Sequence, residues 1–172
     1  MKCSEYMRFE DIKLKKMVWS LMENTSNNKA YFHLPGLFEF YDLYSVFLPL
    51  YRNHREYFYD RCEIASVYGA PADCIWGGGR AGFGECEAKD VLALMNEYGI
   101  SSRLTFSNSL LRPEHLTDRK CNALCELFGG SKGVQNGVII HSDLLLEHIK
   151  RIIPAFISFH RLQRFRLISS SF

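Results

Sequence analysis

The chain has 172 residues, of which 47% are hydrophobic and 23% are charged, the balance of an ordinary globular protein with its own core. No apolar run approaches the roughly 18 residues that cross a membrane, and residues 1–16 lack the apolar centre of a signal peptide, so we expect a cytoplasmic protein with no membrane partner. The formal net charge of +2 comes from residues 152–172, which hold three arginines and no acid. Without a clustered basic face elsewhere, we expect no nucleic-acid partner.

The first third of the chain has few clear signals. Residues 8–23 have a helical pattern, and residues 24–29 are typical of a turn. The aromatic-rich segment 31–60 predicts a first strand around residues 37–40 and then a helix. A further strand is predicted within CEIASVYGAP, residues 62–71.

After this segment, short apolar runs alternate with helical patterns. The apolar runs are ADCIWGGGR, SSRLTFSN and NGVIIHSD, with predicted strand tips near Trp76, Phe106 and His141. Helical spacing follows in EAKDVLALMNEYG, TDRKCNALCELFGG and LLLEHIKR. Gly99 fits the end of the first of these helices, and Ser142 or Asp143 fits the start of the last.

This alternation predicts an α/β fold with a parallel sheet covered by helices and roughly four or five βα units. The fold class that we expect is a partial TIM-type (β/α) barrel, because a complete barrel takes about 250 residues. A small doubly wound open sheet is the alternative. We expect residues 1–151 to form one domain.

The chain also resembles a known family over residues 60–151. GVIIHSDLLLEHIKR resembles a strand G-V-I-V-x-D followed by a helix L-L-x-x-I-K, and ADCIWGGGR resembles the tip A-D-x-V-Y-x-G-G, both of the collagenase-like peptidase family. The resemblance implies a bacterial TIM-type barrel. The family includes proteins classed as peptidases, and iron–sulfur enzymes that hydroxylate RNA bases or ubiquinone precursors. The six cysteines here match none of the family's cluster ligands in position, so neither activity carries over and the cofactor stays unknown.

Residues 152–172 are expected to be a non-native or disordered tail. Permitted codons for this segment, read one base earlier after Arg151, encode NYPGIYFVSSTTKVSVDFKQF, which has a turn, a β-branched strand and a polar tip. The pattern predicts a frameshifted read-through, hence a truncated and inactive copy that self-associates through open sheet edges. The alternative is a native amphipathic or disordered tail.

Ligands of parallel α/β folds bind beyond the carboxyl ends of the strands, which selects the glycine-rich tip first. Successive backbone N–H groups at Gly77, Gly78 and Gly79 are suited to approach an anion, and Arg80 is suited to pair with phosphate or carboxylate. We predict that these four residues bind a ligand. The alternative is a plain tight turn.

Two further tips supply the predicted catalytic residues. Asn108 is suited to donate to a substrate carbonyl, or it only forms a turn. His141 is suited to act as a general base or as a metal ligand. Asp143 is suited to orient His141, and the alternative is that Asp143 only caps the following helix. If the chain forms a barrel, we expect Arg80, Asn108, His141 and Asp143 to converge at one mouth.

The cysteines predict no metal site. Cys121 and Cys125 share an apolar helical face without a third ligand nearby in sequence, which indicates buried, reduced thiols. Cys62, Cys74 and Cys86 are too widely spaced to form a motif.

The functional prediction is a fragment of an enzyme of the collagenase-like peptidase type that acts on a small polar or anionic substrate. The alternative is a complete small α/β binding or protein-interaction module, with the aromatic residues between 31 and 59 as its partner surface.

Overall fold

The computed structural model of this chain describes residues 29–78, 86–153 and 158–161, so the helix predicted over 8–23 lies outside the described residues. The chain divides into two compact units, residues 1–30 and 31–172. The expected single domain over 1–151 stays a prediction. None of the described helices is long and apolar enough to cross a membrane.

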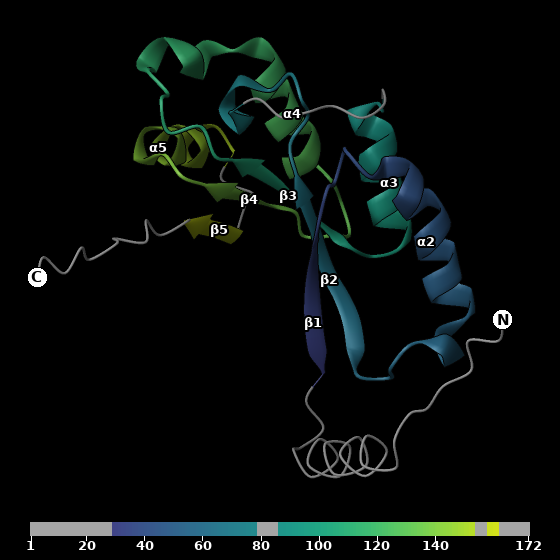
Figure 1. The fold of residues 1–172 in the computed structure, drawn as a ribbon. Helices are drawn as coiled ribbons and strands as arrows, with labels where there is room; N and C mark the ends of the chain where they lie inside the picture. The colour runs from purple at the N-terminus through teal and green to yellow at the C-terminus, as the bar shows by residue number, and fades with distance from the viewer. Residues whose placement is uncertain (1–28, 79–85, 154–157, 162–172) are drawn as a thin grey trace, which may run out of the picture. The chain divides into compact units, whose positions relative to one another are not determined.

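Five strands form one sheet in the order of the chain (Figure 1). They are β1 (Ala30–Pro35), β2 (Cys62–Gly69), β3 (Ser101–Phe106), β4 (Gly137–Ile140) and β5 (Ser158–Arg161). Strands β2 to β5 pair in parallel, with Gly69 opposite Leu104 and Leu104 opposite Val138. The order β1-β2-β3-β4-β5 has no reversal among the described strands, whereas doubly wound sheets reverse their order at a switch point.

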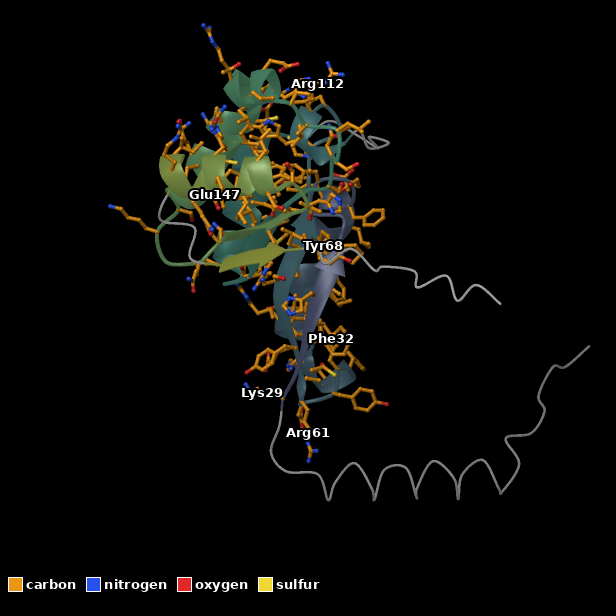
Figure 2. All side chains as sticks on the ribbon, turned by 90° about the vertical axis from the view of Figure 1, so that its left-hand side faces the viewer. Lys29, Phe32, Arg61, Tyr68, Arg112 and Glu147 are labelled. Atoms are coloured by element: carbon orange, nitrogen blue, oxygen red, sulfur yellow. The ribbon has the colours of Figure 1, made fainter. Side chains whose placement is uncertain are left out.

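Strand β1 starts at the same end of the sheet as β2. Arg61 directly precedes β2, and Figure 2 shows it at the same end of the sheet as Phe32 near the start of β1, the end opposite to Arg112. Near the other end, the Leu37 N–H donates to the carbonyl of Tyr68 (3.1 Å). The predicted position of this first strand, residues 37–40, is wrong because Gly36 turns the chain at φ 81° and residues 37–40 form the turn that leads into the next helix.

The strand predicted at ADCIW is also absent from the structure. Strand β2, predicted within CEIASVYGAP, is confirmed and ends at Gly69, and a loop with a 3₁₀ turn at Ile75–Gly77 follows it. The backbone N–H of Cys74 bonds to the carbonyl of Pro71 (3.2 Å), and that of Gly77 bonds to the carbonyl of Cys74 (2.9 Å). These consecutive turns use the groups that a strand would offer to a neighbour, so Trp76 lies in a loop.

Four helices follow the first four strands: α2 (Tyr41–Asn53), α3 (Ala88–Glu97), α4 (Arg119–Gly129) and α5 (Asp143–Ile152). The predicted end of α3 is confirmed, since Gly99 has φ 68° and lets the N–H of Ile100 reach the carbonyl of Met95 (2.9 Å). Of the two predicted caps of α5, Ser142 is the one observed, and its side chain accepts a hydrogen bond from the N–H of Leu145.

The core lies between these helices and one face of the sheet. Leu104 and Phe106 of β3 are fully buried and pair in register with Val138 and Ile140 of β4, and all four share the core with buried residues of every described helix. Neighbouring helices also contact each other in chain order. The contacts are Arg52 over the Tyr98 ring (3.9 Å to its centroid), Asn96 with Ser131 (3.0 Å) and His148 with Asn122 (3.0 Å).

The opposite face of the sheet is more polar. Arg103 and Thr105 alternate with the two core residues of β3, so they point to this second face. Tyr68 is in register with Arg103. The hydroxyl of Ser66 forms a hydrogen bond with His33 Nδ1 (2.6 Å) across β1 and β2.

Part of the predicted tail has regular structure. Residues Ser158–Arg161 form β5, which pairs in parallel with β4, so the expectation of a disordered tail does not hold for these four residues. The other residues from 162 on lie outside the described chain. The frameshift stays a prediction, because it concerns the coding sequence.

We predict that Gly99→Ala lowers the free energy of unfolding by about 1–2 kcal/mol, because a side chain with a Cβ is strained in the left-handed conformation. Gly99→Asn should lose less, because asparagine adopts this conformation more easily. Urea denaturation followed by circular dichroism measures both. Equal stability of the alanine variant and the wild type would show that the end of α3 does not require a left-handed conformation at residue 99.

Candidate functional site

The loop after β2 is held at the edge of the sheet by the fully buried Trp76. Its indole N–H donates to the carbonyl of His115 (2.8 Å). The ring makes edge-on contacts with Phe106 (5.4 Å between centroids) and with His148 of α5 (5.8 Å). One side chain therefore ties this loop to β3, to the segment before α4 and to α5.

The structure brings Gly77 and Gly78 of the glycine-rich tip close to Ser107 and Asn108, and the polar groups of these residues bond to each other. The Asn108 side chain donates to the carbonyl of Ile75 (2.8 Å) and accepts from the N–H of Leu110 (2.8 Å). The Ser107 hydroxyl donates to the carbonyl of Gly77 (2.9 Å). Asn108 thus acts here as a turn former, which was the alternative reading of this residue.

Gly78 lies directly against Asn108, where an added Cβ would come within 3.4 Å of the asparagine backbone. Its φ of 83° is also a conformation that favours glycine. Gly79 and Arg80 lie outside the described residues, so the predicted anion-binding role of this tip stays a prediction.

His141 lies at the same edge of the sheet. Its backbone N–H donates to the carbonyl of Phe106 (3.1 Å), which continues the pairing of β3 and β4 by one residue. Asp143 is the first residue of α5. None of His141, Asp143 and Asn108 lines the groove that we describe next, and their catalytic roles stay predictions.

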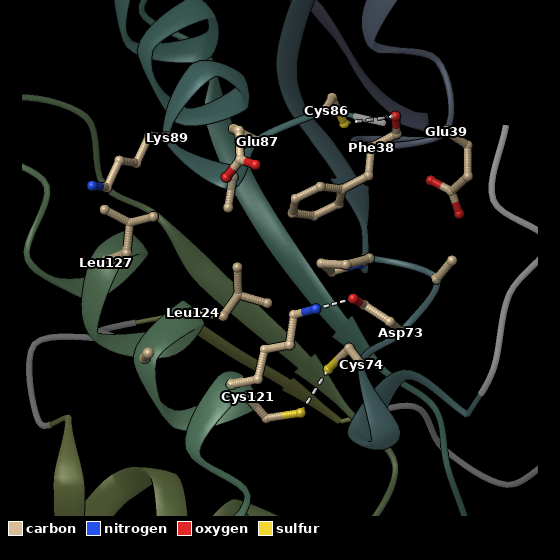
Figure 3. A pocket seen from close by; sticks show the side chains of 15 residues that line it. Phe38, Glu39, Asp73, Cys74, Cys86, Glu87, Lys89, Cys121, Leu124 and Leu127 are labelled. Carbon is tan, nitrogen blue, oxygen red and sulfur yellow. Dashed lines mark hydrogen bonds and ion pairs between the residues drawn. The ribbon is translucent and has the colours of Figure 1, made fainter. Parts of the chain in front are cut away.

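A groove of about 790 Å³ opens where β1 and β2 end (Figure 3). Its walls are residues 38–39 after β1, residues 71–74 after β2, residues 86–89 at the start of α3, and α4 residues between 120 and 127. Parallel α/β folds bind their ligands at this carboxyl end of the sheet. The groove is therefore the candidate functional site.

Two thiols meet at the groove. The Sγ atoms of Cys74 and Cys121 are 3.0 Å apart, although 47 residues separate them in sequence. The residues that precede them, Asp73 and Lys120, form an ion pair beside the thiols (Figure 3). Cys121 is also fixed by its backbone, whose N–H donates to the capping carboxylate of Asp118 (2.8 Å).

The two thiols differ in acidity. The hydrogen bond between the two thiols lowers the pKa of the Cys74 thiol, and the backbone N–H groups of Gly77 and Trp76 lower it further. The pKa of Cys121 is raised, first because its proton is held by Cys74 and then because it is buried. The pair therefore loses its first proton from Cys74.

The groove lining carries more carboxylates than ammonium groups. Cys86, whose thiol donates to the Phe38 carbonyl (3.4 Å), has a raised pKa. Burial is the main cause, followed by the carboxylates of residues 42, 39, 90 and 87. The lining itself holds three carboxylates and two ammonium groups, those of Glu39, Asp73, Glu87, Lys89 and Lys120. A small net negative charge of this kind favours cationic ligands.

The sequence analysis predicted only part of this site. Cys121 and Cys125 are buried thiols, as expected, with exposed fractions of 1% and 0%. The approach of Cys74 to Cys121 was missed, because contacts between distant loops leave no spacing pattern in the sequence. Among the described residues, no group of three or more histidine, cysteine, aspartate or glutamate side chains is placed to hold a metal ion.

Comparison of the chain with protein-family models, with curated proteins and with solved structures finds no match. The resemblance to the collagenase-like peptidase family thus stays a prediction, and the functional argument rests on the geometry of the chain itself.

We predict that Trp76→Ala lowers the free energy of unfolding by about 3–5 kcal/mol through loss of buried contacts. Trp76→Phe keeps most of the ring packing and leaves the His115 carbonyl without its donor, which should cost about 1–3 kcal/mol. Chemical denaturation measures both variants. If both were as stable as the wild type, Trp76 would not anchor the loop.

Proposed function

We propose that the chain is a barrel-type α/β domain that binds a small polar ligand in the groove at the carboxyl ends of its strands. The sequential order of parallel strands supports the barrel-type arrangement, because barrel strands follow one another around the sheet, whereas doubly wound sheets reverse direction. The chain-order contacts between neighbouring helices support the same arrangement.

The single observation that carries the binding proposal is the position of the groove. It is bordered by the ends of β1 and β2 and by the first turns of α3 and α4, and its volume of about 790 Å³ lies within the range of small-molecule pockets. Its lining combines apolar side chains such as Leu124 and Leu127 with a few charged groups, the usual composition of such pockets.

The charges narrow the ligand class. Three carboxylates and two ammonium groups line the groove, those of Glu39, Asp73, Glu87, Lys89 and Lys120, and Lys120 is engaged by Asp73. We therefore propose a ligand with a positively charged group, such as an amine or an amino acid. The anionic substrate expected from the sequence depended on Arg80 and its glycines. Gly77 and Gly78 do not line this groove, and Gly79 and Arg80 lie outside the described residues.

Binding is proposed here separately from a reaction, because Asn108, His141 and Asp143 do not line the groove. A catalytic role for His141 is a separate proposal, which requires a ligand bound near that residue.

The binding proposal predicts that small amines and amino acids shift the amide resonances of Glu87, Lys89 and Leu124 in two-dimensional NMR spectra. Ala123 is exposed and lines the groove, so Ala123→Trp should abolish these shifts by filling the space. Glu126→Trp is the matched control on the same helix, outside the lining, and should bind like the wild type. The proposal fails if the shifts persist in Ala123→Trp, or if inorganic phosphate and small carboxylates bind in preference to amines.

A second candidate function is that of an interaction module, favoured by an exposed apolar stripe on α2. Leu43, Val46 and Leu50 follow helical spacing and are 60%, 70% and 48% exposed. We propose a second copy of the chain as the partner, because one stripe can pair with itself across a two-fold axis.

This candidate predicts concentration-dependent dimers in sedimentation velocity. The double variant Leu43→Glu, Val46→Glu should remain monomeric, because charges would be buried in the contact. Leu110→Glu, at a residue that is 80% exposed and outside α2, should associate like the wild type. A monomeric wild type at every concentration would rule out this candidate.

A further inference from the structure

We propose that Cys74 and Cys121 form a redox-active dithiol that small cationic disulfides oxidise to an intramolecular disulfide bond. The Sγ atoms are 3.0 Å apart, whereas a disulfide bond measures about 2.05 Å, so the sulfurs need to approach by about 1 Å. This activity goes beyond ligand binding and does not require that the groove hold any other molecule.

The surroundings of the pair hold it in this position. Trp76, two residues after Cys74, anchors the loop through its hydrogen bond to the His115 carbonyl (2.8 Å). Asp118 caps α4 and fixes the backbone of Cys121 (2.8 Å). The ion pair between Asp73 and Lys120 joins the same two segments one residue earlier. The two backbone segments that carry the thiols are therefore both fixed, and this keeps the sulfur atoms close to each other.

The pair is reached through the groove. Cys74 and Cys121 are 3% and 1% exposed, yet both line the open space of about 790 Å³. That space is large enough for a small disulfide, and the excess of carboxylates over ammonium groups in its lining favours a positively charged one. Cystamine, a disulfide with two ammonium groups, has this chemistry.

The position of Cys74 directly before the 3₁₀ turn Ile75–Gly77 assigns the roles of the two thiols, because the backbone N–H groups of Trp76 and Gly77 lie close enough to stabilise its thiolate. Cys74 has the lowered pKa, and a thiolate is the species that attacks a disulfide. Cys121, with its raised pKa, keeps its proton until the mixed disulfide has formed. Cys86 and Cys125 also have raised pKa values through burial, which disfavours them as the attacking group.

The exchange balances in two steps. The Cys74 thiolate attacks one sulfur of cystamine, the S–S bond of cystamine breaks, and the first cysteamine leaves as a thiolate. This leaving thiolate takes the proton of Cys121, whose own thiolate attacks Sγ of Cys74 and expels the second cysteamine, which takes up the proton that Cys74 had released. The two protein thiols lose two electrons and two protons in all, and one cystamine becomes two cysteamines.

The test treats the full native chain with cystamine, blocks remaining thiols with iodoacetamide, and maps peptides by mass spectrometry without reduction. We expect one species in which the peptides that contain Cys74 and Cys121 are joined, and which dithiothreitol separates. Separately alkylated peptides, or a bond from either residue to Cys86 or Cys125, would overturn the proposal. This measurement on the wild type does not depend on whether any variant folds.

Variants test the roles of the two thiols. Cys121→Ser should stop at a mixed disulfide between Cys74 and cysteamine, whereas Cys74→Ser should react with cystamine about tenfold more slowly at Cys121. The matched control is Cys125→Ser, on the same apolar face of α4, which should form the Cys74–Cys121 bond at the wild-type rate. Equal reaction of Cys74→Ser and Cys121→Ser would refute the assignment of the attacking thiol.

The charge of the oxidant gives an independent readout. Cystamine should oxidise the pair about tenfold faster than dithiodiglycolate, a small disulfide with two carboxylates, and added salt should reduce the difference. Equal rates at low salt would refute the preference for cationic disulfides.

Discussion

The arrangement of the whole carboxyl edge depends on the burial of Trp76. Because ADCIW does not pair as a strand, residues 71–78 form most of their backbone hydrogen bonds within their own turns, and the indole ring ties them to the neighbouring elements. Its N–H satisfies the carbonyl of His115, and its ring contacts β3 and α5. A buried indole needs such a partner for its polar atom, so the ring and the loop fix each other.

The position of Trp76 determines which groups meet the residues before it and after it in the sequence. The residues that follow it, Gly77 and Gly78, contact Ser107 and Asn108, where backbone and side-chain polar groups bond to each other. The residue two positions before it, Cys74, is turned toward α4 and meets Cys121 at the groove. The loop thus divides the carboxyl edge into a self-bonded turn and an open groove with reactive thiols. The proposed preference of the groove for positive charge rests on the excess of carboxylates over ammonium groups in its lining.

Local patterns in the sequence predict local structure well here. The spacing of apolar residues predicts α3, α4, α5 and the strands β2, β3 and β4 because each has a buried face with a regular period. The first strand was misplaced because β1 is almost entirely exposed, so no burial pattern marks it. ADCIW has the composition of a strand, but its apolar residues are buried by a loop that folds over the sheet. The meeting of Cys74 with Cys121 depends on that folding, and no spacing in the sequence encodes it.

Hydrogen exchange at the Trp76 indole tests the central claim most directly. The chain has two tryptophans, so Trp19→Phe assigns the two indole signals in a proton–nitrogen NMR spectrum. A ring that is fully buried and bonded to His115 should exchange its Nε1 proton as slowly as the backbone amides of the central strand β3. Exchange of that proton at the rate of a free indole in water would show that the loop is not anchored, and that the groove and its thiol pair are not built as described.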